Sequence, residues 1–315
     1  QRIDARGTRA LMERLVEKGV NYIDTARGYT VSESYLGEAL SGGLREKFIL
    51  ATKSMSRGYA DMARDIGISL SNLRTDYIDL YQLHNIKSDA DFELAFSAEG
   101  AVAAIQDAIR AGKVGHLGAT AHSVDSFERL LSYPEIETIM FPYNIVESQG
   151  EALMERAAAQ NVGVIAMKPL AGGNITDGTL AMRYILQNKT CTLAIPGMAT
   201  LEEIEQNTAA AEQDGPLTPE ELAACEAIRA GLSGNFCRRC GYCAPCTVGI
   251  DIPGIFTLEN YLKHYDLADW VLSNFTGPED KLITEATARA ADAALEIIAR
   301  GVPAAANDYN GAGPQ

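Results

Sequence analysis

Residues 76–84 have the sequence DYIDLYQLH, a short run rich in β-branched, aliphatic and aromatic residues. Such a run is typical of a buried β-strand. Apolar residues recur with helical spacing before it, at 62–73, and after it, at 101–111. A strand between two helices indicates a parallel sheet whose strands are joined by crossover helices.

The same unit recurs along the chain in both directions. Seven strands that alternate with helices predict an α/β fold, a (β/α)8 TIM barrel whose first strand we expect to precede Gln1. An open, doubly wound sheet is the alternative, and it is disfavoured because no Gly-x-Gly-x-x-Gly turn follows an early strand. The predicted strands are 20–25, 48–53, 77–84, 114–120, 138–144, 162–168 and 192–196, and the predicted helices are 6–17, 33–40, 62–73, 101–111, 124–131, 151–160, 180–187 and 201–211.

The chain length of 315 residues fits one barrel of about 250 residues with an appendage. We therefore expect three parts: a barrel at 1–215, a helical, cysteine-containing extension at 216–300 and a flexible tail at 301–315. Within the extension, Thr218, Pro219 and Glu221 have the pattern of a helix start with a capping box. Helices are expected there at 220–232, 255–272 and 279–300.

Composition excludes several classes of function. The formal net charge of −15 disfavours nucleic acid and anionic membrane surfaces, since both attract clustered Lys and Arg. No apolar run approaches the roughly 18 residues of a membrane-spanning helix. Of six cysteines, four lie within 237–246, which is typical of a ligand cluster in a reducing compartment. A cytoplasmic protein that acts on a small molecule is the expectation.

Four polar residues follow the ends of three consecutive predicted strands: Asp24, Tyr29, Lys53 and His84. In a barrel the carboxyl ends of the strands converge on one face. A carbonyl that receives a hydride becomes an alkoxide and needs a proton donor, and Tyr29 can supply that proton. A tyrosine hydroxyl ordinarily ionises only near pH ~10, so a nearby Lys53 ammonium would be needed to stabilise the phenolate. Asp24 would orient Lys53, and His84 would position the carbonyl oxygen.

These residues also carry a family resemblance. The strings NYIDTA (21–26), ATK (51–53) and DYIDLYQLH (76–84), with Tyr29 and the GKV at 112–114, resemble the aldo-keto reductases over roughly residues 10–210. The resemblance implies a TIM barrel that binds NAD(H) or NADP(H) in extended form, without a Rossmann fold. It also implies that Asp24, Tyr29, Lys53 and His84 form a catalytic tetrad for interconverting a carbonyl and an alcohol.

The resemblance further implies a cofactor groove along later strand ends. Many relatives that prefer NADPH carry a Lys-Ser pair and a following Arg where this chain has Gly197, Met198 and Glu203. A glutamate would repel a 2′-phosphate and accept a hydrogen bond from a 2′-hydroxyl, so a preference for NAD(H) is predicted. The expected contacts are Asn144 for the nicotinamide carboxamide; Lys168, Pro169, Leu170 and Gly172 for the pyrophosphate; and Pro196, Gly197, Met198, Glu203 and Asn207 for the adenosine phosphate.

The cysteine segment predicts a metal site formed by Cys237, Cys240, Cys243 and Cys246, each separated from the next by two residues. Closely spaced thiolates hold iron–sulfur clusters, while zinc, usually held by two separated Cys-x2-Cys pairs, and an empty site are the alternatives. The segment resembles a ferredoxin-like extension of one aldo-keto reductase subgroup, which implies a [4Fe–4S] cluster. Thr247 stands where a proline is usual, and no cysteine follows Cys246, so one cluster at most is expected.

Two other functions remain open from the sequence. An iron–sulfur protein on the same scaffold would transfer electrons or sense redox state, with a redox partner protein. A non-catalytic subunit of a larger assembly is the other. Substrate choice is expected to lie in the segment 85–98 and in the C-terminal part of the chain.

Overall fold

The computed structural model of the chain describes residues 3–213, 215–233, 236–238, 243, 246 and 250–264. The predicted helix at 279–300, the tail at 301–315 and Cys240 lie outside these residues. The chain divides into two compact units, one spanning residues 2–251 and the other comprising Gln1 and the residues from 252 onward. The described element of the second unit is helix α11 (Ile252–His264).

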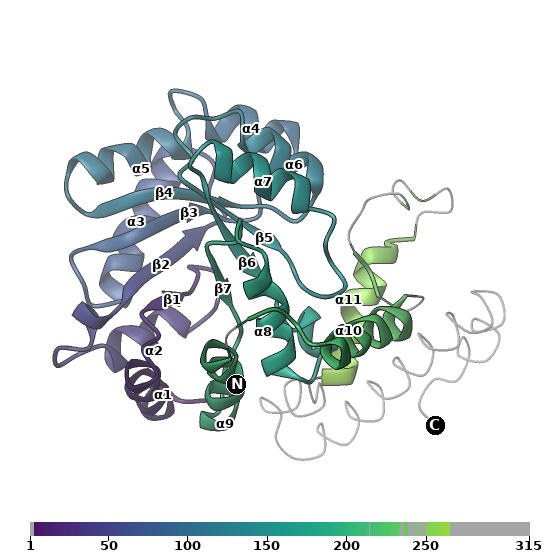
Figure 1. Cartoon of the computed structure of the whole chain (residues 1–315). Coiled ribbons are helices and arrows are strands. Elements are labelled where there is room, and N and C mark those ends of the chain that lie inside the picture. The colour runs from purple at the N-terminus through teal and green to yellow at the C-terminus, as the bar shows by residue number, and fades with distance from the viewer. Residues whose placement is uncertain are drawn as a thin grey trace, which may run out of the picture. The chain divides into compact units, whose positions relative to one another are not determined.

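Seven parallel strands form a nearly closed barrel in the first unit, as the sequence predicted (Figure 1). Each strand pairs with the next in chain order, from β1 to β7. All carboxyl ends therefore lie at one end of the barrel. The strands are β1 (Tyr22–Asp24), β2 (Ile49–Ser54), β3 (Ile78–Leu83), β4 (Val114–Thr120), β5 (Thr138–Pro142), β6 (Gly163–Met167) and β7 (Leu193–Ile195).

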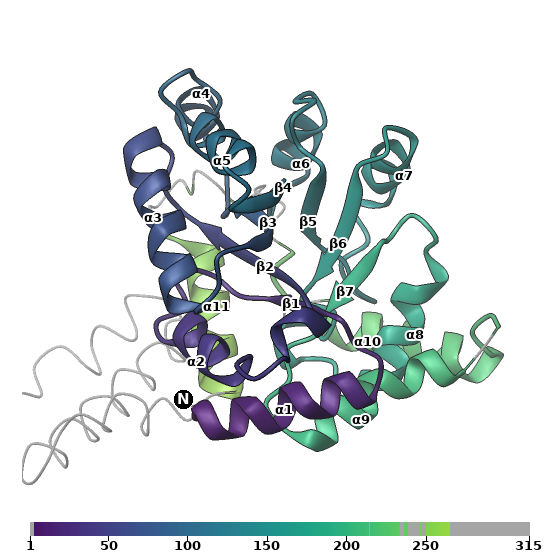
Figure 2. The same cartoon turned by 90° about the vertical axis from the view of Figure 1, so that its left-hand side faces the viewer.

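Helices surround the strands on the outside of the barrel (Figure 2). Nine of the predicted helices occur with ends shifted by a few residues, including the one that starts at the Thr218–Glu221 capping box. A further helix, α4, lies in the segment 85–98, and begins with a capping box formed by Ser88 and Asp91. The helices are α1 (Ala5–Glu17), α2 (Ser32–Ala39), α3 (Tyr59–Asn72), α4 (Asp89–Ala95), α5 (Ala101–Arg110), α6 (Val124–Leu130), α7 (Glu151–Ala159), α8 (Gly178–Gln187), α9 (Leu201–Ala209) and α10 (Pro219–Leu232).

The strands bury alternate side chains on the two sides of the barrel wall. Leu80, Met140 and Ile165 belong to a small cluster contributed by the strands alone, which fills the interior. Their neighbours in sequence, such as Tyr81 and Phe141, join a larger cluster that includes helix residues. The larger cluster fixes the helices against the wall and so fixes where each strand ends.

Helix α10, assigned from the sequence to the extension, packs within the first unit. Its Cys225 is buried in a cluster with Ile145, Val146, Leu180 and Ala181. Among the described residues, no helix combines the length and apolar character needed to cross a bilayer.

Candidate active site

The predicted catalytic residues meet at the carboxyl ends of β1, β2 and β3. Lys53 lies near the end of β2 with only 2% of its side chain exposed, and its ammonium bonds to the Asp24 carboxylate at the end of β1. It also donates to the backbone oxygen of Thr25 at 2.9 Å. A buried ammonium requires such partners, because an unpaired charge in this position would be costly.

Tyr29 lies above this pair in the loop that follows β1. The loop is fixed to the end of β2, since the Arg27 N–H donates to the Lys53 carbonyl oxygen at 2.9 Å. The Lys53 ammonium is 5.0 Å from the centroid of the Tyr29 ring. The Tyr29 ring meets the His84 ring edge to face, with centroids 5.8 Å apart. Tyr29 is 47% exposed, so a molecule from solvent can reach it.

His84 follows β3 and is neutral at physiological pH. Burial, followed by the charges of Lys53 and Arg57, lowers the pKa of His84 to about 4. Its backbone is held on both sides, because its N–H donates to Ser54 and its carbonyl accepts from Arg57 at 2.7 Å. One ring nitrogen, Nδ1, is buried without a hydrogen-bond partner among the described residues. A neutral imidazole carries one N–H group, which it can donate to a substrate oxygen.

Gln82 and Arg57 complete the site and were not predicted. The Gln82 side-chain amide donates to the second oxygen of Asp24 at 3.0 Å. Burial raises the pKa of Asp24, and the Lys53 ammonium acts against that shift. Gln82 lies two residues before His84 on β3, so the period-two pattern of a strand could have placed both on one face. No local signal marks Arg57.

Asn144, predicted to bind the nicotinamide carboxamide, follows β5 and is fully buried. Its amide donates to the Lys168 carbonyl and to the Glu147 carboxylate, both at 2.9 Å. Its side-chain oxygen accepts from the N–H groups of Val146 and Glu147. These bonds connect Asn144 to Lys168, a second predicted cofactor residue. Both N–H groups and the oxygen of the Asn144 amide therefore have hydrogen-bond partners within the protein.

The loop after β6, predicted to border the pyrophosphate, has an unusual backbone. Lys168 and Ala171 have left-handed φ angles of +56° and +49°, which non-glycine residues rarely adopt. Gly172 and Gly173 follow with φ of +70° and +96°. Left-handed backbone clusters at ligand-binding loops, and glycine lets a ligand approach the chain closely. This backbone would let a ligand approach residues 168–173 closely.

The predicted adenosine-phosphate residues lie after β7 and on α9. Gly197 is exposed and Met198 is partly buried in the loop. The Glu203 carboxylate accepts from the N–H groups of Ala199 and Thr200, which makes it half of a capping box. Glu203 thus has a structural role at this helix start.

The cysteine prediction rests partly outside the described residues, because Cys240 is not among them. Cys237, Cys243 and Cys246 are each half-buried. Within the described part of the chain, no group of three or more His, Cys, Asp or Glu side chains is arranged to hold a metal ion.

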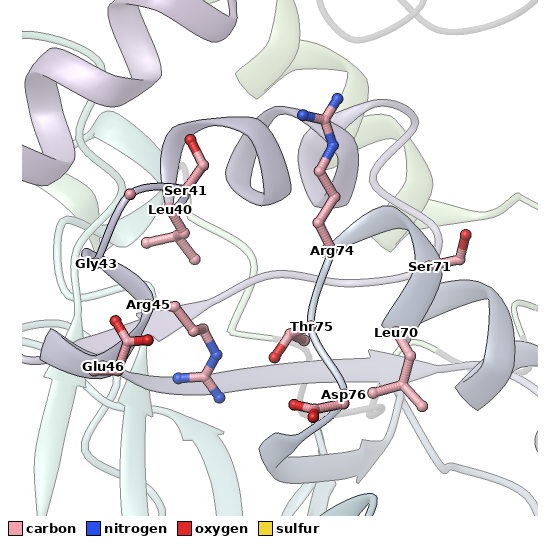
Figure 3. Close-up of a pocket in the computed structure, with 11 residues that line it drawn as sticks. Leu40, Ser41, Gly43, Arg45, Glu46, Leu70, Ser71, Arg74, Thr75 and Asp76 are labelled. Atoms are coloured by element: carbon pink, nitrogen blue, oxygen red, sulfur yellow. The ribbon is translucent and has the colours of Figure 1, made fainter.

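A pocket of about 640 Å³ lies at the opposite end of the barrel (Figure 3). Its lining residues come from 40–46 and 70–76, which precede β2 and β3. Arg45 lines it, but donates to the carbonyls of Phe48 and Tyr77 and pairs with Asp79. The pocket contains none of the predicted site residues, and Arg45 links the start of β2 to the start of β3.

Comparison with known proteins places this arrangement in one class, the oxidoreductases with a parallel α/β barrel. A model of the Aldo/keto reductase family matches residues 1–180, more than half of the chain. Methylglyoxal reductase YeaE of Escherichia coli is 28% identical over 66% of this chain and 79% of its own length. An aldo-keto reductase of Bacillus halodurans, AKR11C1 in its holo form, superposes with a TM-score of 0.62 at 25% identity, over 71% of this chain and 88% of its own.

A Klebsiella pneumoniae aldo-keto reductase in complex with NADPH shares the fold, with a TM-score of 0.61 at 24% identity over 71% of this chain and 85% of its own. The chain belongs to the aldo/keto reductase family. It is accordingly an oxidoreductase that depends on NAD(H) or NADP(H).

Proposed function

We propose that this chain interconverts a carbonyl and an alcohol on a small molecule, with Tyr29 as the general acid and base. The observation that carries the proposal is the position of Lys53, buried against Asp24 and 5.0 Å from the Tyr29 ring. A fixed cation beside a tyrosine stabilises its phenolate and makes the proton available. Tyr29 is exposed and its ring contacts that of His84, so a substrate carbonyl that arrives from solvent could meet both side chains.

In the direction of carbonyl reduction, each residue of the predicted tetrad has a separate role. A bound nicotinamide cofactor supplies the hydride to the carbonyl carbon. The Tyr29 hydroxyl gives its proton to the oxygen, so that the C=O bond becomes C–OH and a phenolate remains. Lys53 stabilises that phenolate, and Asp24 keeps the ammonium oriented. His84, being neutral, donates a hydrogen bond to the oxygen and does not compete as the acid.

Replacing Tyr29 with Phe tests the assignment. Turnover of a panel of aldehydes and ketones, including the methylglyoxal named for the E. coli relative, should fall about 100- to 10,000-fold. The dissociation constants of NADH and NADPH, measured by fluorescence titration, should stay within about twofold, because the ring remains. Unchanged turnover would remove Tyr29 from the proton-transfer step.

The same titration tests cofactor preference, for which we propose NAD(H). Residues 196–207, which the family resemblance assigns to the adenosine phosphate, contain no Lys or Arg that could bind a 2′-phosphate. NADH should therefore bind wild-type protein more tightly than NADPH. Equal affinity would overturn this preference without affecting the role of Tyr29.

For the cysteine segment we propose one [4Fe–4S] cluster held by Cys237, Cys240, Cys243 and Cys246, with zinc as the alternative metal. The support is the spacing and donor chemistry of four thiolates. Protein purified without oxygen should show a broad band near ~400 nm and about four irons per chain. About one zinc and no colour would favour a structural site, and would also remove the need for a redox partner protein. A thiol-rich site of either kind supports a reducing, cytoplasmic location.

A further inference from the structure

Helix α10 lies outside the β/α repeat and packs against two loops of the predicted cofactor groove. Its Cys225 is 1% exposed and lies in an apolar cluster. In that cluster, Ile145 and Val146 follow β5, while Ala171 and Ile175 follow β6. One helix thus covers the turn that carries Asn144 and the left-handed loop at 168–173.

A polar anchor reinforces this packing. Arg229 of α10 donates from Nε to the carbonyl oxygen of Ile145 at 2.8 Å, and from Nη2 to the Tyr184 hydroxyl at 3.0 Å. Ile145 directly follows Asn144, whose own side chain closes the turn onto Val146. Because the Asn144 side chain closes this turn with four hydrogen bonds, the bond from Arg229 to Ile145 also constrains the position of Asn144.

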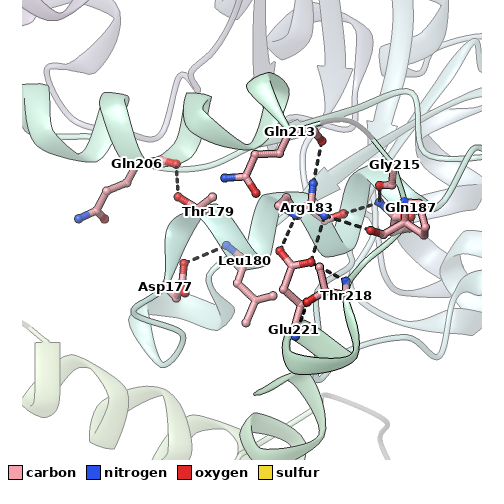
Figure 4. Close-up of polar contacts among 11 residues, drawn as sticks. Asp177, Thr179, Leu180, Arg183, Gln187, Gln206, Gln213, Gly215, Thr218 and Glu221 are labelled. Atoms are coloured by element: carbon pink, nitrogen blue, oxygen red, sulfur yellow. Dashed lines mark hydrogen bonds and ion pairs between the residues drawn. The ribbon is translucent and has the colours of Figure 1, made fainter. Parts of the chain in front are cut away.

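The start of α10 is tied to α8 by a second arginine (Figure 4). Arg183, 4% exposed, pairs with both oxygens of Glu221 at 2.6 and 3.0 Å. It also donates to the carbonyls of Gln213 and Pro216, at 2.7 and 3.2 Å, in the linker before α10. A bidentate pair of this kind is directional, so it fixes the angle at which α10 enters.

We propose that α10 is a clamp on the cofactor groove, with Arg229 as its positioning residue. By holding the Asn144 turn and the 168–173 loop together, α10 keeps the groove in the form that binds the nicotinamide cofactor. The inference rests on the proposed function, since it needs a cofactor in that groove. Coupling between two sites is reciprocal, so a bound cofactor must in turn hold α10 in place.

The reactivity of the Cys225 thiol measures how often α10 opens in wild-type protein. A thiol that is 1% exposed reacts with an alkylating reagent only when α10 opens. Saturating NADH or NADPH should slow alkylation of Cys225 several-fold, as measured by mass spectrometry of the peptides. Cys191, which precedes β7 at the other end of the barrel, should react at the same rate with and without cofactor.

Arg229→Met removes the hydrogen bonds to Ile145 and Tyr184, together with an ion pair to exposed Glu226 on the same helix, and keeps an apolar stem. It should raise the dissociation constant of the cofactor and the KM for the cofactor about tenfold, and it should speed the alkylation of Cys225. The kcat should stay nearly unchanged. Arg156→Met is the matched control, because Arg156 of α7 forms an exposed ion pair with Glu128 of α6, away from α10. Tyr184→Phe removes one of the two bonds and should give a smaller change in the same direction.

The clamp is wrong if Arg229→Met and Tyr184→Phe bind the cofactor as tightly as wild-type protein does. It is also wrong if the rate of Cys225 alkylation is the same with and without cofactor. Neither result would contradict the proposed function. Failure of wild-type protein to bind either nucleotide overturns both. An equal loss of cofactor affinity in Arg229→Met and Arg156→Met also contradicts the clamp, because it would reflect general destabilisation of the protein.

Discussion

At the scale of single residues, His84 lies between two cations that oppose its protonation. Lys53 is on β2 and Arg57 in the loop after it, while Asp24 is already engaged by Lys53 and Gln82. Burial and these charges lower the pKa of His84 to about 4, from an unfolded value of about 6.5. The imidazole is therefore uncharged through the neutral pH range.

This shift makes stability depend on pH in a definite direction. Between about pH 6.5 and 4 the unfolded chain binds a proton that the folded chain refuses, so stability is fully present above 6.5 and is lost as the pH falls toward 4. His84→Gln should therefore show a smaller drop in Tm between pH 7 and 4.5 than wild-type protein does. Thermal unfolding across that range measures it.

His116→Gln provides the comparison, because it removes a histidine whose side chain is 63% exposed. The Tm of this variant should fall between pH 7 and 4.5 as steeply as the Tm of wild-type protein. If both variants follow the wild-type curve, His84 takes up its proton in the folded state as readily as in the unfolded chain, and burial beside two cations does not lower its pKa.

The residues of the site differ in how far the sequence could reveal them. Asp24, Lys53 and His84 were predictable because each lies at a strand end, where the barrel topology brings side chains together. Gln82 reaches Asp24 from 58 positions away, and nothing local to either residue indicates that bond. Arg57 donates to the carbonyl oxygens of His84 and Asn85 and pairs with Asp91, and no local pattern indicates these distant partners.

At the scale of elements, the strands were predictable from apolar runs and most helices from their 3.6-residue spacing. Helix α4 was missed because its seven residues are too few to show a period, although Ser88 and Asp91 form a capping pattern. Glu203, predicted to contact the cofactor, forms a capping box with Thr200, and the spacing of these two residues is already visible in the sequence. The docking of α10 depends on Arg229 and Arg183, whose contacts are too distant for any local pattern.

At the scale of the whole molecule, the barrel is held together differently between its first strand, β1, and its last, β7. Every consecutive strand pair is hydrogen-bonded, but β1 and β7 are not paired with each other in the described part of the chain. Helices bridge this seam instead. Glu205 of α9 accepts from Arg14 of α1 at 2.6 Å and pairs at 2.7 Å with Lys18, the C-cap residue of α1.

We expect Glu205→Gln to lower Tm, because the seam lacks the strand bonds that support other neighbouring helices. Hydrogen bonds from Lys18 and Arg14 lower the pKa of Glu205, so its contribution is present at neutral pH and is lost as the carboxylate is protonated in acid. The difference from wild-type protein should shrink in ~1 M salt, which screens exposed charges. Glu128→Gln breaks a comparable exposed pair between α6 and α7, where β5 and β6 are bonded, and should change Tm less. Equal shifts in the two variants, unaffected by salt, would mean that this ion-pair network does not close the barrel.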